Sequence, residues 1–353
     1  MPILGHKISL TRYMEIRKKY MERLKKPESW LWHLMGFIIP SLVIFGNVKG
    51  GFWVSSGLIT ALVIFPIIEK FIGEDKSKRE IRKNGFPFEV ILIVHALLMI
   101  PVIISICYRG MLDGNILTTW VASISTGITS GISGIIVAHE LGHKKRYSIR
   151  WYIGRMLLFL VMYSHFTTEH NFTHHRYVGT KKDSATAPKG RGFWVHLFQT
   201  IPNQFKSAWE ININQSKYLI FNVMFRDMII QLGLCVGIYL IFGLWAIAAF
   251  LVQSLFSIYL LEYINYIRHY GLERKLGEKE TKMHSWQTKM RLSRWTLLEL
   301  SLHPSHHMKA TLPFWQLQPY ENVNELPNGY YGVFWAAMFP FIWKARIDPL
   351  IKN

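Results

Sequence analysis

The chain has 353 residues, of which 50% are hydrophobic and 14% aromatic, and its formal net charge is +19. Several apolar runs are close to the roughly 20 residues that a helix needs to cross a bilayer, which argues against a soluble globular protein. Every Lys and Arg except Lys49 and Arg109 lies before the first apolar run or after the second, fourth or sixth. This one-sided charge is typical of a membrane protein rather than a nucleic-acid-binding one.

Residues 1–28 are basic and amphipathic, with no short apolar core before a cleavage site, so we expect a cytoplasmic N-terminal segment and no cleaved signal. Residues 29–138 contain four apolar runs. Residues 228–266 form one run of about twice the length of a span, which we divide at Gly243. The predicted spans are Leu31–Gly46, Phe52–Ile68, Phe86–Cys107, Ile116–Ala138, Met228–Phe242 and Leu244–Tyr266.

Short cytoplasmic loops collect Lys and Arg, which places both termini in the cytoplasm and the protein in the inner membrane. Residues 139–227 and 267–353 then become two cytoplasmic segments, and Trp151–Phe166 is expected to lie at the interface because it is too short to cross. The fold class predicted is therefore an all-α integral membrane protein with six transmembrane helices. The only two cysteines, Cys107 and Cys235, cannot build a four-cysteine iron site, so any electron-transfer centre must come from another chain.

Nine of the fifteen histidines occur in four short motifs within the two cytoplasmic segments. On a continuing helix, His139 and His143 share a face and can reach one metal ion. His170 and His174 have the same spacing, and His175 is expected to point about 100° away, toward a second ion. The other four are His269, which follows the last span, and His303, His306 and His307, of which His303 and His306 lie about one turn apart.

Nine imidazoles are too many ligands for one ion and about right for two, and imidazole binds iron, zinc or copper. Packed together without metal, these rings would repel one another if protonated or bury unpaired nitrogens if neutral. One HxxxH motif alone is often just two surface histidines. Four motifs at the ends of spans on one face favour a two-metal site.

The motifs resemble those of the integral-membrane di-iron superfamily, which contains acyl desaturases, sterol oxidases and alkane hydroxylases. The resemblance is strongest to the membrane alkane hydroxylases (alkane 1-monooxygenases) and to xylene monooxygenase. It covers most of the chain beyond about residue 30, including Gly73–Asp75, His284–Trp286, Leu326–Tyr330 and Phe339–Trp343. The third motif, Asn265–Leu272, discriminates most, since desaturases lack it in this form.

The resemblance implies a cytoplasmic di-iron domain in which the nine histidines bind two non-haem iron ions. It also implies insertion of one atom of O2 into a terminal C–H bond of an alkane or similar hydrocarbon taken from the bilayer, to give a primary alcohol. Rubredoxin and its reductase would supply the electrons. The chain departs from the family pattern at Phe172, Thr173, Arg268, Pro304 and Ser305, where no histidine is lost but the surroundings of the metals and the substrate change.

Metal-binding histidines usually donate their second ring N–H to a carboxylate or a carbonyl. Asn265 lies one turn before His269 and could fill this role. Trp53 in the second span could limit the length of substrate in a channel, although an aromatic residue near a span end is more often an interface anchor. The candidates beside the histidines, each equally compatible with an ordinary structural role, are Glu140, Glu169, Asn171, Asp183, Glu262 and Asn265.

Two other functions fit part of the pattern. His139–His143 also matches the zinc metalloprotease motif, with Glu140 as general base, but that activity leaves most of the histidines without a role. A fatty-acyl or lipid desaturase or hydroxylase of the same superfamily is the nearer alternative.

Overall fold

The computed structural model describes residues 25–77, 79–215 and 218–352. The predicted basic segment 1–28 therefore lies outside the described residues except for Lys25–Glu28. Within the described residues the chain is helical, with three isolated β-bridges and no strand. This confirms the predicted all-α fold class.

Six helical stretches are long and apolar enough to cross a membrane, which confirms the predicted number. They extend past the predicted runs, because helical hydrogen bonding continues through the polar residues at their ends, as at Asp113. The six stretches are Trp30–Lys49, Gly51–Ile72, Phe86–Asp113, Leu117–Gly142, Val223–Phe242 and Leu244–His269.

Three of these stretches are single helices: α5 (Phe86–Asp113), α12 (Val223–Phe242) and α13 (Leu244–His269). The others are composite. The first joins the 3₁₀-helix η1 (Trp30–Phe37) to α2 (Ile38–Lys49). The second consists of η2 (Gly51–Ser55), α3 (Ser56–Ile59), η3 (Thr60–Ile64) and α4 (Phe65–Ile72). The fourth consists of α6 (Leu117–Thr129), η4 (Ser130–Ile136) and α7 (Val137–Gly142).

Two spans contain π-helical segments, η3 and η4, and a third π-helix, η5 (His170–His174), lies outside the spans. A π-helix closes its hydrogen bonds from residue i to i+5 and is often found at functional sites. All three segments contribute side chains to one internal cavity, described below. The three π-helical segments, where the helices are locally wider, therefore all border this cavity.

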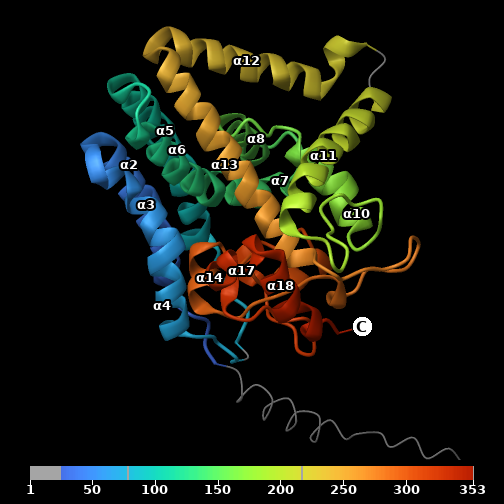
Figure 1. Cartoon of the computed structure of the whole chain (residues 1–353). Coiled ribbons are helices and arrows are strands. Elements are labelled where there is room, and N and C mark those ends of the chain that lie inside the picture. Colours follow the sequence, from blue (N-terminus) through green and yellow to red (C-terminus); the bar gives the residue numbers. More distant parts are fainter. Residues whose placement is uncertain (1–24, 78, 216–217, 353) are drawn as a thin grey trace, which may run out of the picture.

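The spans pack as a bundle in which α13 lies against α5 and α6, and α2 lies against α5 (Figure 1). Between α12 and α13 the chain turns at Gly243, whose φ of +85° is a conformation that glycine adopts without strain. This confirms the predicted division of the long apolar run. From that turn α12 diverges from α13, and it is the least buried of the six stretches (Figure 1).

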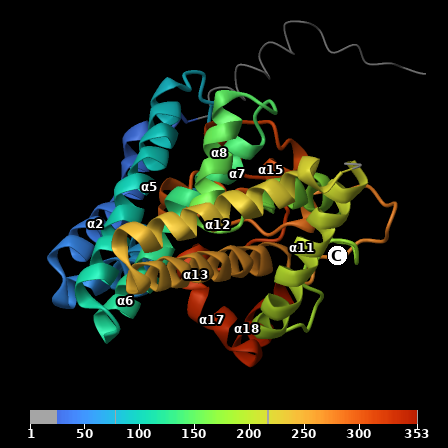
Figure 2. The ribbon, with the colours of Figure 1, turned by 90° about the horizontal axis from the view of Figure 1, so that it is seen from above.

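Of the remaining helices, the C-terminal ones pack at one end of the bundle, beneath the spans, whereas α11 rises beside α13 (Figures 1 and 2). The predicted interface segment contains most of α8, which packs against α7; the depth of this segment in a bilayer stays a prediction. These elements are α8 (Ile149–Leu160), α9 (Phe166–Glu169), α10 (His175–Tyr177), α11 (Phe193–Gln215), η6 (Leu219–Phe221), η7 (Lys282–His284), α14 (Arg291–Thr296), α15 (His303–Met308), η8 (Phe314–Gln316), α16 (Gly329–Gly332), α17 (Phe334–Met338), α18 (Pro340–Ile347) and η9 (Asp348–Leu350).

A buried carboxylate, Glu69, ties the second span to the C-terminal segment. It accepts hydrogen bonds from the backbone N–H of Ser293 and of Gly332, both at 3.1 Å, and from the hydroxyl of Ser293. The backbone of Gly329 passes so close that a Cβ there would lie 2.4 Å from this carboxylate. A glycine is therefore required where the C-terminal chain crosses Glu69.

A second buried carboxylate, Glu299, holds the first span to the same end of the molecule. Arg294 lies 2.7 Å and Arg82 3.2 Å from it, and His33 of the first span lies 3.2 Å away. Burial opposes ionisation of Glu299, but the charge of Arg294 and the other partners outweighs it and holds the pKa of Glu299 well below its usual range. These contacts fix the position of residues 267–353, which include the end of α13 and four of the nine histidines.

Candidate metal centre

The four histidine motifs, far apart in the sequence, meet in the folded chain. They are carried by α7 and the residue after it, by η5 and α10, by the last residue of α13, and by α15. In each of two groups, the possible ligand atoms all lie within 4.8 Å of one another. The first group is His139, His143, His170, His175 and His306, and the second is His174, His269, His303 and His307.

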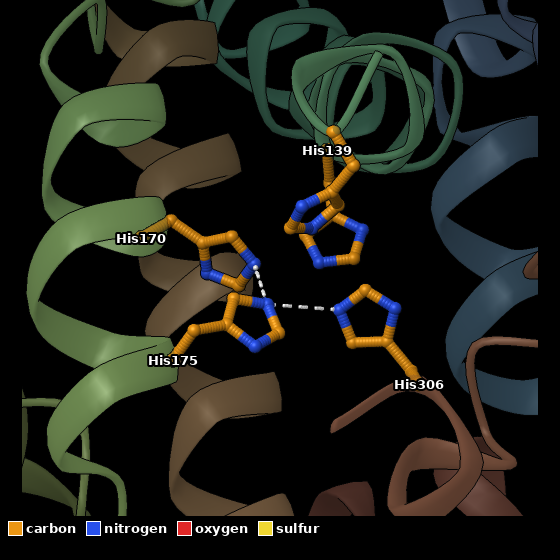
Figure 3. Close-up of side chains that lie close together, drawn as sticks. His139, His170, His175 and His306 are labelled. Carbon is orange, nitrogen blue, oxygen red and sulfur yellow. Dashed lines mark hydrogen bonds between the residues drawn. The ribbon is translucent and has the colours of Figure 1, made fainter. Parts of the chain in front are cut away.

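Figure 3 shows four rings of the first group, which converge from three separate segments of the chain. His175 Nε2 lies 3.0 Å from His170 Nε2 and 3.1 Å from His306 Nε2. In the second group, His303 Nε2 lies 3.0 Å from both His269 Nε2 and His307 Nε2. The Nε2 atoms of several rings thus point at common centres.

The division into groups differs from the expectation for the second motif. His170 and His174 were predicted to face one ion with His175 directed elsewhere, but the structure pairs His170 with His175 and sends His174 to the second group. The reason is the π-helix η5, because its i to i+5 periodicity brings His170 and His175 onto one side. The α-helical spacing used for the prediction was therefore wrong here.

The fourth motif shows a similar difference. His303 and His306 are one turn apart, but they fall in different groups, and His303 instead joins His307. On an α-helix the side chains of residues i and i+4 differ in direction by about 40°, and those of residues i and i+3 by about 60°. The i, i+4 pair is therefore better aligned toward one centre. Helix α15 thus lies between the two groups and contributes to both.

The ring nitrogens fit metal ions better than they fit one another. An imidazole nitrogen carries either a proton or a lone pair, so His175 Nε2 cannot form a strong hydrogen bond to two neighbouring Nε2 atoms at once. Both ring nitrogens of His139 and the Nε2 of His143 are buried with no hydrogen-bond partner. A cation at the centre of each group would satisfy these lone pairs.

Electrostatics favour the neutral form of the rings, which is the form that binds metals. Burial, followed by the charge of Lys144, lowers the pKa of His143 to about 4. For His170 and His306, burial and then neighbouring histidines hold the pKa well below its ordinary value. At neutral pH these rings therefore present lone pairs without first losing a proton.

One of the six predicted supporting residues contacts a histidine of the groups through its side chain. Asp183 Oδ2 lies 3.0 Å from His174 Nδ1 and accepts a hydrogen bond from the Thr186 hydroxyl at 2.6 Å. Because Asp183 accepts a hydrogen bond from Nδ1–H, the proton of the neutral ring stays on Nδ1 and the lone pair of Nε2 is free for a metal. This arrangement is the carboxylate–histidine pairing common at metal sites.

The side chains of the other five do not contact the rings in this way, and four of them have other partners. Glu140 pairs with Lys144 at 2.9 Å, and Asn171 donates to the backbone carbonyl of Gly142 at 3.1 Å. Asn265 donates to Glu262 at 3.1 Å rather than to a ring. Glu262 also accepts a hydrogen bond from Gln204 at 3.0 Å. Glu169 is buried, and its Oε1 has no hydrogen-bond partner. Burial, followed by the charges of Asp183 and Glu262, raises the pKa of Glu169 well above its ordinary value.

Two contacts to the rings were not predicted from the sequence. His269 Nδ1 lies 3.1 Å from the backbone carbonyl of His284, and His307 Nδ1 lies 2.9 Å from Glu280 Oε1, although the latter contact is not aligned as a hydrogen bond. Glu280 belongs to a charged loop, and a backbone carbonyl leaves no trace in the sequence, so no spacing pattern points to either. Both partners come near the rings only through the course of the loop after α13.

An apolar cavity of about 100 Å³ leads from the spans to the histidines. Its wall follows one face of the fourth span from Ile128 through Gly131 and Ile135 to His139, a length of about 16 Å along the helix. Side chains of the second and sixth spans and of α16–α17 complete it, and His170, His174 and His303 close the inner end. The cavity thus reaches both groups from the membrane bundle.

Trp53 is not among the residues that line this cavity. It lies at the start of the second span, 47% exposed and packed against Phe45, whereas the cavity wall begins two turns later at Ala61. The prediction that Trp53 borders a substrate channel is therefore not supported. Its position fits the interface anchor named as the alternative.

A second, more polar cavity of about 470 Å³ reaches the histidines from another side. It touches His143 and His175 of the first group and His307 of the second. Lys144, Arg146 and Arg155 also line it, of which Lys144 pairs with Glu140 and Arg155 with Asp227, and no Asp or Glu is among the described lining residues. We call this space the basic vestibule.

Comparison with known proteins yields a consistent set of similarities. A family model described as fatty acid desaturase matches residues 115–337. Alkane 1-monooxygenase 1 of Pseudomonas aeruginosa is 28% identical over 353 residues, covering 94% of this chain and 92% of that protein. The alkane 1-monooxygenase of Acinetobacter baylyi is 30% identical over 309 residues, covering 83% and 75%, respectively. The xylene/toluene monooxygenase hydroxylase component of Pseudomonas putida is 25% identical over 338 residues, covering 88% and 85%.

Proposed function

The chain belongs to the fatty acid desaturase family and, within it, to the alkane 1-monooxygenases, and on that basis we propose that it hydroxylates the terminal carbon of an alkane or a similar hydrocarbon. The observation that carries this proposal is the apolar cavity that runs from the membrane bundle to two groups of histidines. Hydrocarbons dissolve in the bilayer, so a cavity among the spans is the natural place for such a substrate to bind.

We further propose that the nine histidines bind two iron ions, one in each group. The chemistry that the metals would supply is activation of O2, with one oxygen atom entering the C–H bond and the other leaving as water after the uptake of two electrons and two protons. Five imidazoles in one group and four in the other, most of them buried, provide enough neutral ligands for two ions.

The side chains of the cavity would orient the substrate and exclude water. Ile132 and Ile135 form an apolar wall that leads to His139, so a hydrocarbon lying along it directs one end toward the histidines. Asp183 and the carbonyl of His284 would hold the rings of His174 and His269 with Nε2 directed inward. Both effects position groups before the reaction rather than take part in bond breaking.

The electrons must come from outside, because the described chain offers no cysteine cluster and only two cysteines in all. As the donor we propose a rubredoxin reduced by its reductase, following the resemblance noted above. The basic vestibule supports a negatively charged donor, since no Asp or Glu is among its described lining residues, and the exposed Arg146, which has no carboxylate partner in the described chain, lies at this route to both histidine groups.

We also propose that both termini and the metal centre face the cytoplasm and that the protein resides in the inner membrane. The distribution of Lys and Arg supports this orientation. The turn between the first two spans, near Lys49, would then face the other side of the membrane.

The experiment that tests the function is purification in detergent, a count of bound metal, and product analysis with octane, a xylene and a fatty acid, using reduced rubredoxin and its reductase. We expect about two irons per chain and 1-octanol from octane. One zinc and no oxidised product would instead support the metalloprotease alternative, and a hydroxylated or desaturated fatty acid as the only product would support the lipid-oxidising alternative.

A further inference from the structure

The apolar cavity contains one charged side chain, that of Arg268. Among the described residues that line the cavity there is no Lys, Asp or Glu, and the remaining polar groups are histidines, Asn265 and the tyrosine hydroxyls. Arg268 lies in the last turn of α13, one residue before His269, and it is 6% exposed. A permanently charged guanidinium therefore lies at the histidine end of a space otherwise suited to hydrocarbon.

Within the described residues this guanidinium lacks an acidic partner. Its Nε donates to the hydroxyl of Tyr330 at 3.0 Å, and its central carbon lies 5.3 Å from the centre of the same ring. The two terminal nitrogens make no hydrogen bond or ion pair with any described residue. Four of the five donors of this side chain thus remain available.

The other buried arginines of the described chain are all paired with a carboxylate. Arg82 and Arg294 contact Glu299, Arg109 contacts Asp113, and Arg155 contacts Asp227. This comparison shows how the fold treats buried cations elsewhere. Arg268 is the exception, and it is also the one that faces a cavity.

Burying a charge without a counter-charge is unfavourable, so an unpaired cation at a cavity wall indicates that the missing partner is a ligand. Metal ions in the two histidine groups would add positive charge nearby and strengthen the preference for an anion. A guanidinium offers paired donors in a planar fork that matches a carboxylate. The apolar remainder of the cavity requires that the rest of the ligand be aliphatic.

We propose that Arg268 makes this cavity a binding site for aliphatic carboxylic acids, with the carboxylate on the guanidinium beside the histidines and the chain along the wall formed by Ile128, Gly131 and Ile132. The proposal deepens the proposed function, since it places the acid in the space assigned to the hydrocarbon. A medium-chain fatty acid is then a competitive ligand. Its affinity depends on Arg268, whereas the affinity for an uncharged hydrocarbon of similar length does not.

The test uses the full-length, metal-loaded protein in detergent or nanodiscs at neutral pH, with octanoate as probe. Calorimetry measures octanoate binding directly, and the octane-dependence of turnover at several octanoate concentrations gives the mode of inhibition. Methyl octanoate, which keeps the chain but not the charge, is measured in parallel. The variants are R268Q, R268K and, as a matched control, R346Q, which removes an exposed arginine in α18.

We expect octanoate to bind the wild type and to compete with octane. In R268Q the octanoate affinity falls about tenfold or more, as for loss of a charge-assisted hydrogen-bonded pair, while methyl octanoate changes by less than about threefold. R268K retains the charge without the fork and is expected to lie between, which keeps the test decisive if R268Q does not fold. R346Q should match the wild type.

Octanoate that binds R268Q or R268K as tightly as the wild type would overturn the proposal, since the acid would then be held by the metals or by the chain alone. Failure of octanoate to bind the wild type would overturn it too. If octane is not oxidised but octanoate binding still depends on Arg268, the proposed function fails and this inference stands.

Discussion

Replacing Asp183 with Asn tests whether the two histidine groups bind metals independently. In the native chain one carboxylate oxygen lies 3.0 Å from His174 Nδ1 and 2.6 Å from the Thr186 hydroxyl, while the other accepts the N–H of Ala185 at 3.0 Å. An asparagine amide has only one acceptor oxygen. If that oxygen keeps the bond to Ala185, an NH2 group faces His174 Nδ1 and favours the tautomer whose Nε2 carries the proton.

The expected effect is a selective loss of metal affinity in the second group. Removal of a carboxylate that orients a metal-binding histidine typically weakens binding by about 10–100-fold, or about 1.4–2.7 kcal/mol. His174 belongs to the second group, whereas the first draws on five other histidines. Chelator titration of the D183N variant, followed by measurement of the remaining iron, should therefore release about one metal per chain at a concentration that leaves the other in place.

The control is Asp348→Asn, because Asp348 accepts a hydrogen bond from the Tyr270 hydroxyl at 2.8 Å and contacts no histidine of the two groups. It should retain both metals like the wild type. If D183N also retains both with unchanged affinity, or loses both together, the assignment of His174 to a separate metal site is wrong.

Three further changes probe the cavity, the packing of the C-terminal segment and the topology. Gly131→Leu adds four carbon atoms to the wall of a cavity of about 100 Å³ and should lower kcat/KM for long alkanes at least tenfold relative to short ones, as product analysis of a chain-length series would measure. Gly329→Ala places a Cβ 2.4 Å from the Glu69 carboxylate and forces alanine to a φ of +68°, so the free energy of unfolding should fall by more than the roughly 1–3 kcal/mol of the backbone strain alone, seen as a lower Tm. A membrane-impermeant thiol reagent added from outside should label cysteine at position 49 but not at position 181, both of which are exposed in the fold.

Each of these changes has its own control. Gly233→Leu adds the same side chain in α12 where nothing lies within 4 Å, and an equal shift in chain-length preference would contradict the role of Gly131. Gly277→Ala imposes a positive φ of +95° in open space, so a Tm as low as that of G329A would show that strain, not the contact with Glu69, is responsible. Labelling at position 181 from outside would show that the topology is the reverse of the one proposed.

The elements that could be predicted are those that depend on local composition. Long uncharged runs must be helical in a bilayer, because only a helix satisfies its own backbone hydrogen bonds there, and this predicted all six spans. Gly243 could be identified as the turn since it interrupts a run too long for one span. The nine histidines could be singled out because ligand spacing is a local pattern.

The assignment of rings to groups could not be predicted, since it depends on the π-helical form of η5, which brings His175 to the side of His170 while His174 joins the other group. The same is true of Glu280 and of the His284 carbonyl, which approach the rings only after a loop has folded back. Trp53 shows the opposite case, where a plausible residue on the right span lies outside the cavity.

The sequence by itself determined that this chain is a membrane protein of six helices with enough histidines for two metals, because hydrophobic length and ligand count are properties of segments. Only the tertiary structure decided which histidines share a centre, where the cavity runs, and that Arg268 faces it without an acidic partner. Those outcomes depend on the distances and directions between side chains from different helices, which are defined only once the helices have packed.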